Sequence, residues 1–267
     1  MPISLRSIGC AALTLGVVAF LGLTATSDAA QKRLAKDLNH VTTVTSEKKA
    51  ERLYKGLLSL GLPSAWKFSE YGPISSGGVR LGNLNVELGS GTSPLAGDQF
   101  ATFEPPSLKG LTSRLDARGI KHGKPVPTKA GSKLLYTRVV LPSYSEVNSS
   151  TVQFCAYAFP TGKPSVKAPA NKAGLVNVPR VVLNTKRPAS WAKLLAPARA
   201  SHGNTYRLPS GPLVQLNKSN RNSIARLDVR VKKVPRAARA FRAVGIPVEG
   251  GIARLGPLRL RLLPQGS

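Results

Sequence analysis

The chain has 267 residues, and its 39 Lys and Arg against 12 Asp and Glu give a formal net charge of +27. Cys155 is the only cysteine after residue 30, so a mature protein without its first 30 residues cannot use internal disulfides and depends on its core. No run of five consecutive basic residues occurs, which excludes a polycationic tail.

The first 30 residues are predicted to be an export signal. Arg6 precedes an apolar run over residues 8–23, and the small residues Ser27 and Ala29 fit a signal-peptidase site. Because the run is short and interrupted by Gly and Thr, cleavage near Ala29 or Ala30 is favoured over a retained membrane anchor. We therefore expect a periplasmic or secreted protein.

The positive charge is concentrated in the second half of the chain. Residues 31–160 hold 17 basic and 9 acidic residues, a net +8, whereas residues 161–267 hold 21 and 2, a net +19. Such a field attracts polyanions. For an exported protein these are an anionic envelope polymer or a membrane surface, and nucleic acid is disfavoured. The alternative is a solvated basic surface without a dedicated partner.

Residues 38–88 form the clearest structural unit. β-Branched residues predict a strand over 38–45, and Ser46 is expected to cap the helix that follows. Gly61 is expected to end that helix in the left-handed conformation. The helix carries one apolar stripe, formed by Ala50, Leu53, Tyr54, Leu57 and Leu58. Three strands are then expected, over 66–71, 77–81 and 84–88.

A second unit of the same kind is predicted from residue 99. A strand over 99–103 precedes a helix that Ser107 is expected to cap, with Leu108, Leu111 and Leu115 on its apolar face. The prolines at 125 and 127 indicate an edge strand, and β-rich runs follow at 134–141 and 151–159.

Two further units are expected after a linker rich in Pro, Gly, Lys and Ala. In the third, Pro179 interrupts a strand over 176–185, which indicates an edge position or a bulge. Pro188 and Pro235 are expected to open the two helices. The remaining strands are predicted at 206–208 and 213–216 in the third unit, and at 223–229 and 258–262 in the fourth.

Repeated helix ends support this fourfold organisation. They are Leu60-Gly61-Leu62, Arg118-Gly119-Ile120 and Val244-Gly245-Ile246, at intervals of 58 and 126 residues, close to one and two units. The sequence therefore predicts an α+β chain in which a strand, a helix and three strands recur four times, with the last two copies degenerate.

Several segments of the first two units carry a family resemblance: Leu38-Asn39-His40-Val41, the Tyr54 helix with its Leu60-Gly61-Leu62 end, the segment 76–88, Phe103-Glu104-Pro105 and Arg118-Gly119-Ile120. In these segments the chain resembles the vicinal oxygen chelate (VOC) superfamily, which includes glyoxalase I, bleomycin-resistance proteins and extradiol dioxygenases. It is most similar to glyoxalase-like domains. The resemblance covers residues 38–159, and from 175 to 264 it rests on the pattern of units.

This resemblance implies a fold and a domain organisation. Tandem βαβββ modules would form two bowl-like mixed sheets with helices on the outer face. We expect an N-terminal glyoxalase-like domain at 38–160, a linker at 161–174 and a degenerate C-terminal domain at 175–264. Paired modules of this family also form bowls across dimers, so a homodimer is a further expectation.

The resemblance also implies a candidate metal site. In the family, His and Glu side chains from the first and fourth strands of paired modules hold a divalent metal, here Fe, Mn, Zn or Ni. His40 and Glu87 match these positions. The second module departs from the pattern, because no carboxylate stands on its last strand, and two ligands hold a catalytic metal poorly when three are usual.

The residues leave other roles open for this bowl. Glu87 needs a partner if it is buried, and His40, Arg80 or Arg138 could serve as readily as a metal. Gln215 stands near the Glu87 position in the third module, and Arg261 replaces it in the fourth, where a cation would repel a metal. The expected ligand-binding side chains are Asn85, Gln153, Cys155, Tyr157 and Arg80.

Three functions follow as expectations. The leading one is binding of a small anionic or oxygen-rich molecule in the N-terminal bowl. The second is a divalent-metal-dependent lyase or dioxygenase that uses His40, Glu87 and a third, unidentified ligand. The third is a basic surface protein that binds acidic envelope polymers. No Walker loop, dinucleotide glycine fingerprint, nucleophile elbow or HExxH motif is present to favour other classes.

Overall fold

The computed structural model of the chain describes residues 33–71, 74–91, 99–158, 165–197 and 199–266. The predicted export signal at residues 1–30 lies outside them. Among the described helices, none has the length and apolar composition needed to span a membrane.

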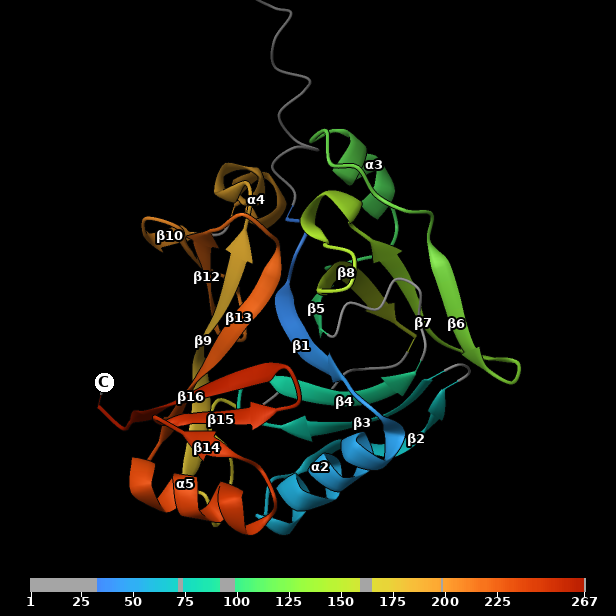
Figure 1. Cartoon of the computed structure of the whole chain (residues 1–267). Helices are drawn as coiled ribbons and strands as arrows, with labels where there is room; N and C mark the ends of the chain where they lie inside the picture. Colours follow the sequence, from blue (N-terminus) through green and yellow to red (C-terminus); the bar gives the residue numbers. More distant parts are fainter. Residues whose placement is uncertain (1–32, 72–73, 92–98, 159–164, 198, 267) are drawn as a thin grey trace, which may run out of the picture.

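Four βαβββ units follow one another along the chain (Figure 1). The first consists of β1 (Asp37–Val44), α2 (Glu47–Ser59), β2 (Ser64–Tyr71), β3 (Ile74–Arg80) and β4 (Asn85–Gly91). The second consists of β5 (Gln99–Glu104), α3 (Leu111–Asp116), β6 (Val126–Ala130), β7 (Lys133–Val140) and β8 (Ser150–Tyr157).

The third unit consists of β9 (Leu175–Thr185), α4 (Pro188–Leu195), β10 (Arg199–His202), β11 (Thr205–Arg207) and β12 (Leu213–Lys218). The fourth consists of β13 (Ser223–Val231), α5 (Val234–Ala243), β14 (Val248–Glu249), β15 (Ile252–Leu255) and β16 (Leu258–Pro264). The last two units thus keep all their strands and are degenerate in sequence only. Strands β10, β14 and β15 were not located in the sequence, because they are short and lack alternation.

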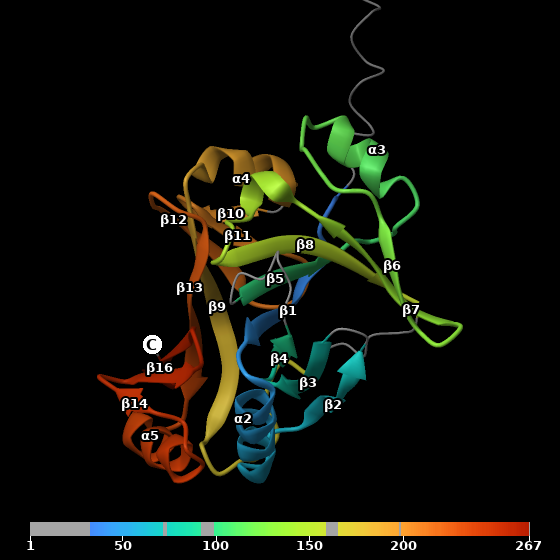
Figure 2. The same cartoon turned by 45° about the vertical axis from the view of Figure 1, so that its right-hand side comes forward.

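The units pair into two curled mixed sheets (Figures 1 and 2). Sheet A has the order β2-β3-β4-β1-β5-β8-β7-β6, and sheet B has the order β10-β11-β12-β9-β13-β16-β15-β14. Within each unit the first and last strands pair in parallel, and the two units of a sheet meet in the antiparallel pairs β1–β5 and β9–β13. This arrangement confirms the predicted tandem modules. Whether each half is an independent domain, with a linker at 161–174, stays a prediction.

Helix α2 begins and ends where the sequence predicted. Its apolar stripe is buried except for Leu58, which is partly buried, and Gly61 has a φ of +87°. The predicted capping bond is wrong, because the Ser46 side chain makes none. Instead, the Glu47 carboxylate accepts a hydrogen bond of 2.8 Å from the Ser75 hydroxyl on β3, which ties the first turn to the sheet.

Helix α3 starts later than predicted. Gly110 precedes it in the left-handed conformation, with a φ of +68°, so the helix cannot extend back to Ser107. Leu108 is therefore 36% exposed instead of packing on the helix face, whereas Leu111 and Leu115 are fully buried.

The sequence had predicted either an edge strand or a bulge at Pro179. Strand β9 lies at the centre of sheet B, so the edge position is wrong and the bulge is confirmed. Its register with β13 shifts between the pairs Arg180–Asp228 and Asn177–Arg230, the interval that contains the proline. A bulge leaves one residue out of the ladder, which accommodates a residue without a backbone N–H.

The outer faces of the two sheets share one hydrophobic core. Phe103 of sheet A packs against Trp191 of α4 with ring centroids 6.3 Å apart. Hydrogen bonds also join the two sheets: the Thr43 hydroxyl of sheet A donates to the Leu255 carbonyl of sheet B at 3.0 Å. Leu84, just before β4, and Val86 and Leu88 on β4 are fully buried on the α2 side, which places Glu87 on the opposite face. We call that opposite face the hollow face of sheet A.

Candidate functional site

One row of side chains crosses the hollow face of sheet A. Its members are paired in register from strand to strand and therefore point to the same side. From β3 through β4, β1 and β5 to β8, the row consists of Arg80, Asn85, His40, Thr102 and Gln153. Cys155 and Tyr157 follow Gln153 at two-residue spacing on β8. The pleat thus places the predicted site residues on one face.

His40 and Glu87 meet on this face. The His40 Nε2 lies 3.3 Å from the Glu87 Oε2, and the side chains are only 7% and 15% exposed. The Thr42 hydroxyl donates a 2.6 Å hydrogen bond to the same oxygen. Burial alone would raise the pKa of Glu87, but His40 and hydrogen bonds from Thr42 and Ser76 together lower it. Glu87 is therefore ionised, and its partner is the histidine that the sequence had left among the alternatives.

The other side of the imidazole is held as well. His40 Nδ1 lies 2.9 Å from Asn39 Oδ1 and 3.2 Å from the Tyr157 hydroxyl. The Asn39 amide oxygen and the Glu87 carboxylate are both hydrogen-bond acceptors, and they flank the imidazole on its two sides. Burial, followed by nearby negative charge, raises the pKa of Tyr157 well above its usual value and keeps the phenol protonated.

Two glycines shape the wall beside His40. A Cβ on Gly78 would stand 2.4 Å from the Trp66 ring on the hollow face, and a Cβ on Gly77 would stand 2.8 Å from the Tyr54 ring on the opposite face. The Gly77–Gly78 pair therefore admits one aromatic ring on each side of β3. The Trp66 ring then meets His40 edge-on, with centroids 5.7 Å apart.

Strand β8 supplies the far side of the site. The Gln153 amide donates to the Thr102 hydroxyl at 3.1 Å. Cys155 is 2% exposed, and burial, followed by the charge of Glu87, raises the pKa of its thiol, which is therefore inert. Arg138 on β7 stands opposite Cys155 in register. Burial raises the pKa of the Tyr136 phenol on β7, and smaller contributions from Cys155 and Glu87 add to that rise.

Four buried polar atoms on this face have no hydrogen-bond partner within the described residues. They are Asn85 Oδ1, Gln153 Oε1, Arg80 Nε and Arg138 Nε. A buried polar group without a partner costs about 1–3 kcal/mol. Two acceptors and two donors are thus left unpaired on the face that holds the His40–Glu87 pair.

The donor set does not fit a three-ligand metal centre. Among the described residues, no third His, Cys, Asp or Glu joins His40 and Glu87 in a cluster that could hold a metal ion. Three protein ligands are usual for a catalytic metal, and Glu87 is already satisfied by protein donors. The metal role of these residues stays a prediction from the resemblance.

From the sequence, most of the residues that lie on this face had been named as site residues, but not Thr42, Asn39 or Thr102. Thr42 carries a usable signal, because it lies two residues after His40 and so shares its face. No sequence signal pointed to Thr102, because its place beside His40 depends on the pairing of β1 with β5.

Comparisons with known proteins show the fold. No protein-family profile and no curated protein sequence matches the chain. A variant of homoprotocatechuate 2,3-dioxygenase from Brevibacterium fuscum matches with a TM-score of 0.54 and 12% identity, over 90% of this chain and 74% of that one. A variant of 4-hydroxymandelate synthase from Streptomyces coelicolor matches with a TM-score of 0.52 and 10% identity, over 80% and 76%.

A hypothetical protein from Staphylococcus aureus matches with a TM-score of 0.53 and 8% identity, over 84% of this chain and 98% of that one. At such identities the likeness concerns the architecture. Two curled sheets built from tandem βαβββ units, together with these structures, lead to one conclusion: the chain has the fold of the VOC superfamily.

Proposed function

We propose that this protein binds a small anionic or oxygen-rich molecule on the hollow face of sheet A. The observation that carries the proposal is the set of unpaired polar atoms on Arg80, Asn85, Gln153 and Arg138. A molecule with both carboxylate and hydroxyl groups matches this set, because guanidinium groups donate to carboxylates and amide oxygens accept from hydroxyls.

The rest of the site supports a selective binding surface. Trp66 and Tyr157 offer aromatic area, and the His40–Glu87 pair is fixed by bonds on both sides of the imidazole. Fixed side chains lose little freedom when a ligand binds, which favours affinity. A small hydroxycarboxylate or phenolic acid is the class of ligand that these groups fit.

A metal-dependent lyase or dioxygenase is the second candidate. The 3.3 Å approach of His40 to Glu87 favours it, as do the names of the dioxygenase and the synthase with the same fold. The missing third donor speaks against it within the described residues. Export, a homodimer and binding of an anionic envelope polymer remain separate proposals that rest on the sequence.

Calorimetry with a panel of small hydroxycarboxylates and phenolic acids tests the leading proposal. We expect one of them to bind, and Arg138→Gln to weaken that binding by about tenfold or more because one charge-assisted contact is lost. Arg52→Gln, on the exposed side of α2, removes the same charge elsewhere and should leave the affinity within about twofold. Equal weakening in both variants, or no binding by any member of the panel, would contradict the proposal.

A further inference from the structure

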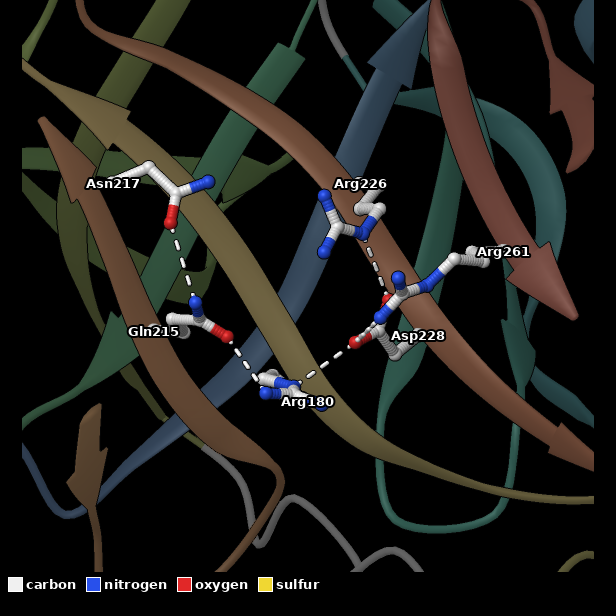
Figure 3. A network of polar contacts seen from close by, with 6 residues as sticks. All are labelled: Arg180, Gln215, Asn217, Arg226, Asp228 and Arg261. Carbon is white, nitrogen blue, oxygen red and sulfur yellow. Dashed lines mark hydrogen bonds and ion pairs between the residues drawn. The ribbon is translucent and has the colours of Figure 1, made fainter. Parts of the chain in front are cut away.

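The hollow face of sheet B carries a different cluster, formed by four charged residues on three adjacent strands. Arg180 on β9 pairs in register with Asp228 on β13, and Asp228 pairs with Arg261 on β16. Arg226 lies two residues before Asp228 and points to the same side. We call Arg180, Arg226, Asp228 and Arg261 the arginine cluster (Figure 3).

Asp228 organises this cluster. Its carboxylate is fully buried and accepts hydrogen bonds of 2.9 Å from the Nε atoms of Arg180, Arg226 and Arg261, and one of 2.7 Å from Arg261 Nη2. Burial alone would raise the pKa of Asp228, but the bonds from Arg261 and Arg226 lower it, so the carboxylate is charged. One anion therefore holds three guanidinium groups in fixed orientations.

Two amides extend the cluster on one side. Arg180 Nη1 donates to Gln215 Oε1 at 2.8 Å, and Gln215 Nε2 donates to Asn217 Oδ1 at 3.3 Å. Figure 3 shows the amide of Asn217, the amide of Gln215 and the arginines on the same side of the strands. The chain of bonds leaves the Asn217 amide nitrogen as a further donor at its end.

The charges of the cluster do not balance. Three guanidinium groups against one carboxylate give +2, and residues 161–267 contain only one other acid, Glu249, which lies exposed on β14. Arg259, two residues before Arg261, and Arg254, its register partner on β15, add positive charge to the same face. Like charges held this close repel one another.

The cluster also keeps unused donors. Within the described part of the chain, Arg226 donates a hydrogen bond only from its Nε, which leaves four N–H groups on its two terminal nitrogens. The side chains of Arg180, Arg226 and Arg261 are 36%, 28% and 37% exposed, respectively, so a small solute can reach them. Oriented guanidinium groups with free forks match the oxygens of phosphate and carboxylate groups.

We propose that the arginine cluster is a second binding site, which takes a small multivalent oxyanion, either a phosphate or a dicarboxylate. Asp228 acts as the positioning residue that orders the guanidinium groups, and the anion supplies the negative charge that Asp228 alone cannot. This site lies on sheet B, so it is separate from the proposed site on sheet A and does not depend on it.

Calorimetry at constant ionic strength tests the proposal, with inorganic phosphate and malonate as separate probes. We expect at least one of them to bind with a stoichiometry near one, and Arg226→Gln to weaken that binding by about tenfold or more. The probe that binds more tightly identifies the phosphate or the dicarboxylate class. Arg226→Lys keeps the charge but loses the fork, so we expect an intermediate loss.

Arg239→Gln is the matched control. Arg239 is exposed on α5, so this variant removes the same charge without touching the cluster. Its affinity should stay within about twofold of the unmodified protein. Binding that falls equally in the Arg226 and Arg239 variants, or that occurs only with long polyanions, would show a diffuse basic field and overturn the proposal. Absence of binding by both probes would overturn it as well.

Discussion

The two hollow faces of this protein share a backbone frame and differ in chemistry. On sheet A the row that crosses the central pair β1–β5 contains the neutral side chains of Asn85, Thr102 and Gln153. Two of their atoms, Asn85 Oδ1 and Gln153 Oε1, lack partners among the described residues. On sheet B the row that crosses β9–β13 contains Arg180, Asp228 and Arg261, whose central carboxylate is fully bonded.

This difference shows which part of the fold is free to vary. The outer faces of both sheets are apolar and share one core, so their residues are constrained by packing. The hollow faces do not contribute to that core, and the same βαβββ frame can therefore carry an acid–histidine pair in one half and a cationic cluster in the other. Four experiments can sharpen or break this comparison.

The largest expected effect comes from Asp228→Asn. The substitution leaves three guanidinium groups facing one another without their shared anion, and we expect a loss of about 3–5 kcal/mol in the free energy of unfolding. Urea denaturation measures it. Glu249→Gln removes the other acid of this half at an exposed position and should change stability by about 0.5 kcal/mol or less. Equal effects would mean that Asp228 does not organise the cluster.

A second comparison concerns Asp37, a buried aspartate without a cation bonded to it in the described residues. Burial, followed by the charge of Glu104, raises its pKa from 3.8 to about 6, and its Oδ1 lacks a hydrogen-bond partner there. The pKa of Asp37 is thus higher in the folded protein than in the unfolded chain. Asp37 therefore contributes fully to stability below pH 3.8, and this contribution is lost as the pH rises through about 6.

We therefore expect the unfolding free energy of the protein to fall by about 2 kcal/mol between pH 4 and pH 7 because of Asp37 alone. Asp37→Asn should remove that part of the pH dependence, as measured by urea denaturation at both pH values. Asp228 has a lowered pKa and should show the opposite sign, losing its contribution as the pH falls below 3.8. An unchanged pH profile in the Asp37 variant would contradict this assignment.

A double-mutant cycle on the pair of sheet A gives a smaller effect. We expect His40→Gln and Glu87→Gln to show a coupling of about 1–2 kcal/mol at pH 7, because the pair is buried and hydrogen-bonded. Since the pKa of Glu87 is lowered, its contribution is present above the ordinary value of 4.5 and is lost as the pH falls through the folded pKa.

The exposed pair Glu51–Lys55 on α2 is the control for this cycle. Its atoms approach to 2.7 Å, closer than those of His40 and Glu87, yet the side chains of Lys55 and Glu51 are 70% and 43% exposed. We expect its coupling to be about 0.5 kcal/mol or less. A coupling at His40–Glu87 no larger than this would mean that burial does not strengthen the pair.

The smallest expected effect is that of divalent metals on sheet A. The described residues offer a metal ion two donors, His40 and Glu87, and no third. Zn²⁺ or Mn²⁺ should therefore raise the melting temperature of the unmodified protein no more than it raises the melting temperature of the Glu87→Ala variant. Differential scanning fluorimetry after chelation measures this. One metal bound per chain, with loss of binding in the Glu87 variant, would instead support the enzyme alternative.

Much of the fold was predictable because its signals are local. The stripe from Ala50 to Leu58 and the alternation of Leu84, Val86 and Leu88 fixed the helix, the last strand and the outward face of the first unit. The start of α3 was misplaced because Ser107 looks like a cap, while the left-handed Gly110 decides where the helix begins. The central place of β9 was missed because a proline usually marks an edge, whereas here a bulge absorbs it.

The sequence by itself determined the order of the units, the family resemblance and the side of β4 on which Glu87 stands, since these depend on residues a few positions apart. Only the tertiary structure decided which charges meet. Arg180 and Asp228 are 48 residues apart, and Thr42 and Glu87 are 45 apart, and their contacts exist only after strands pair in one register. A shift of one residue would turn every such side chain to the opposite face. The strand register therefore decides which polar side chains meet on the two hollow faces.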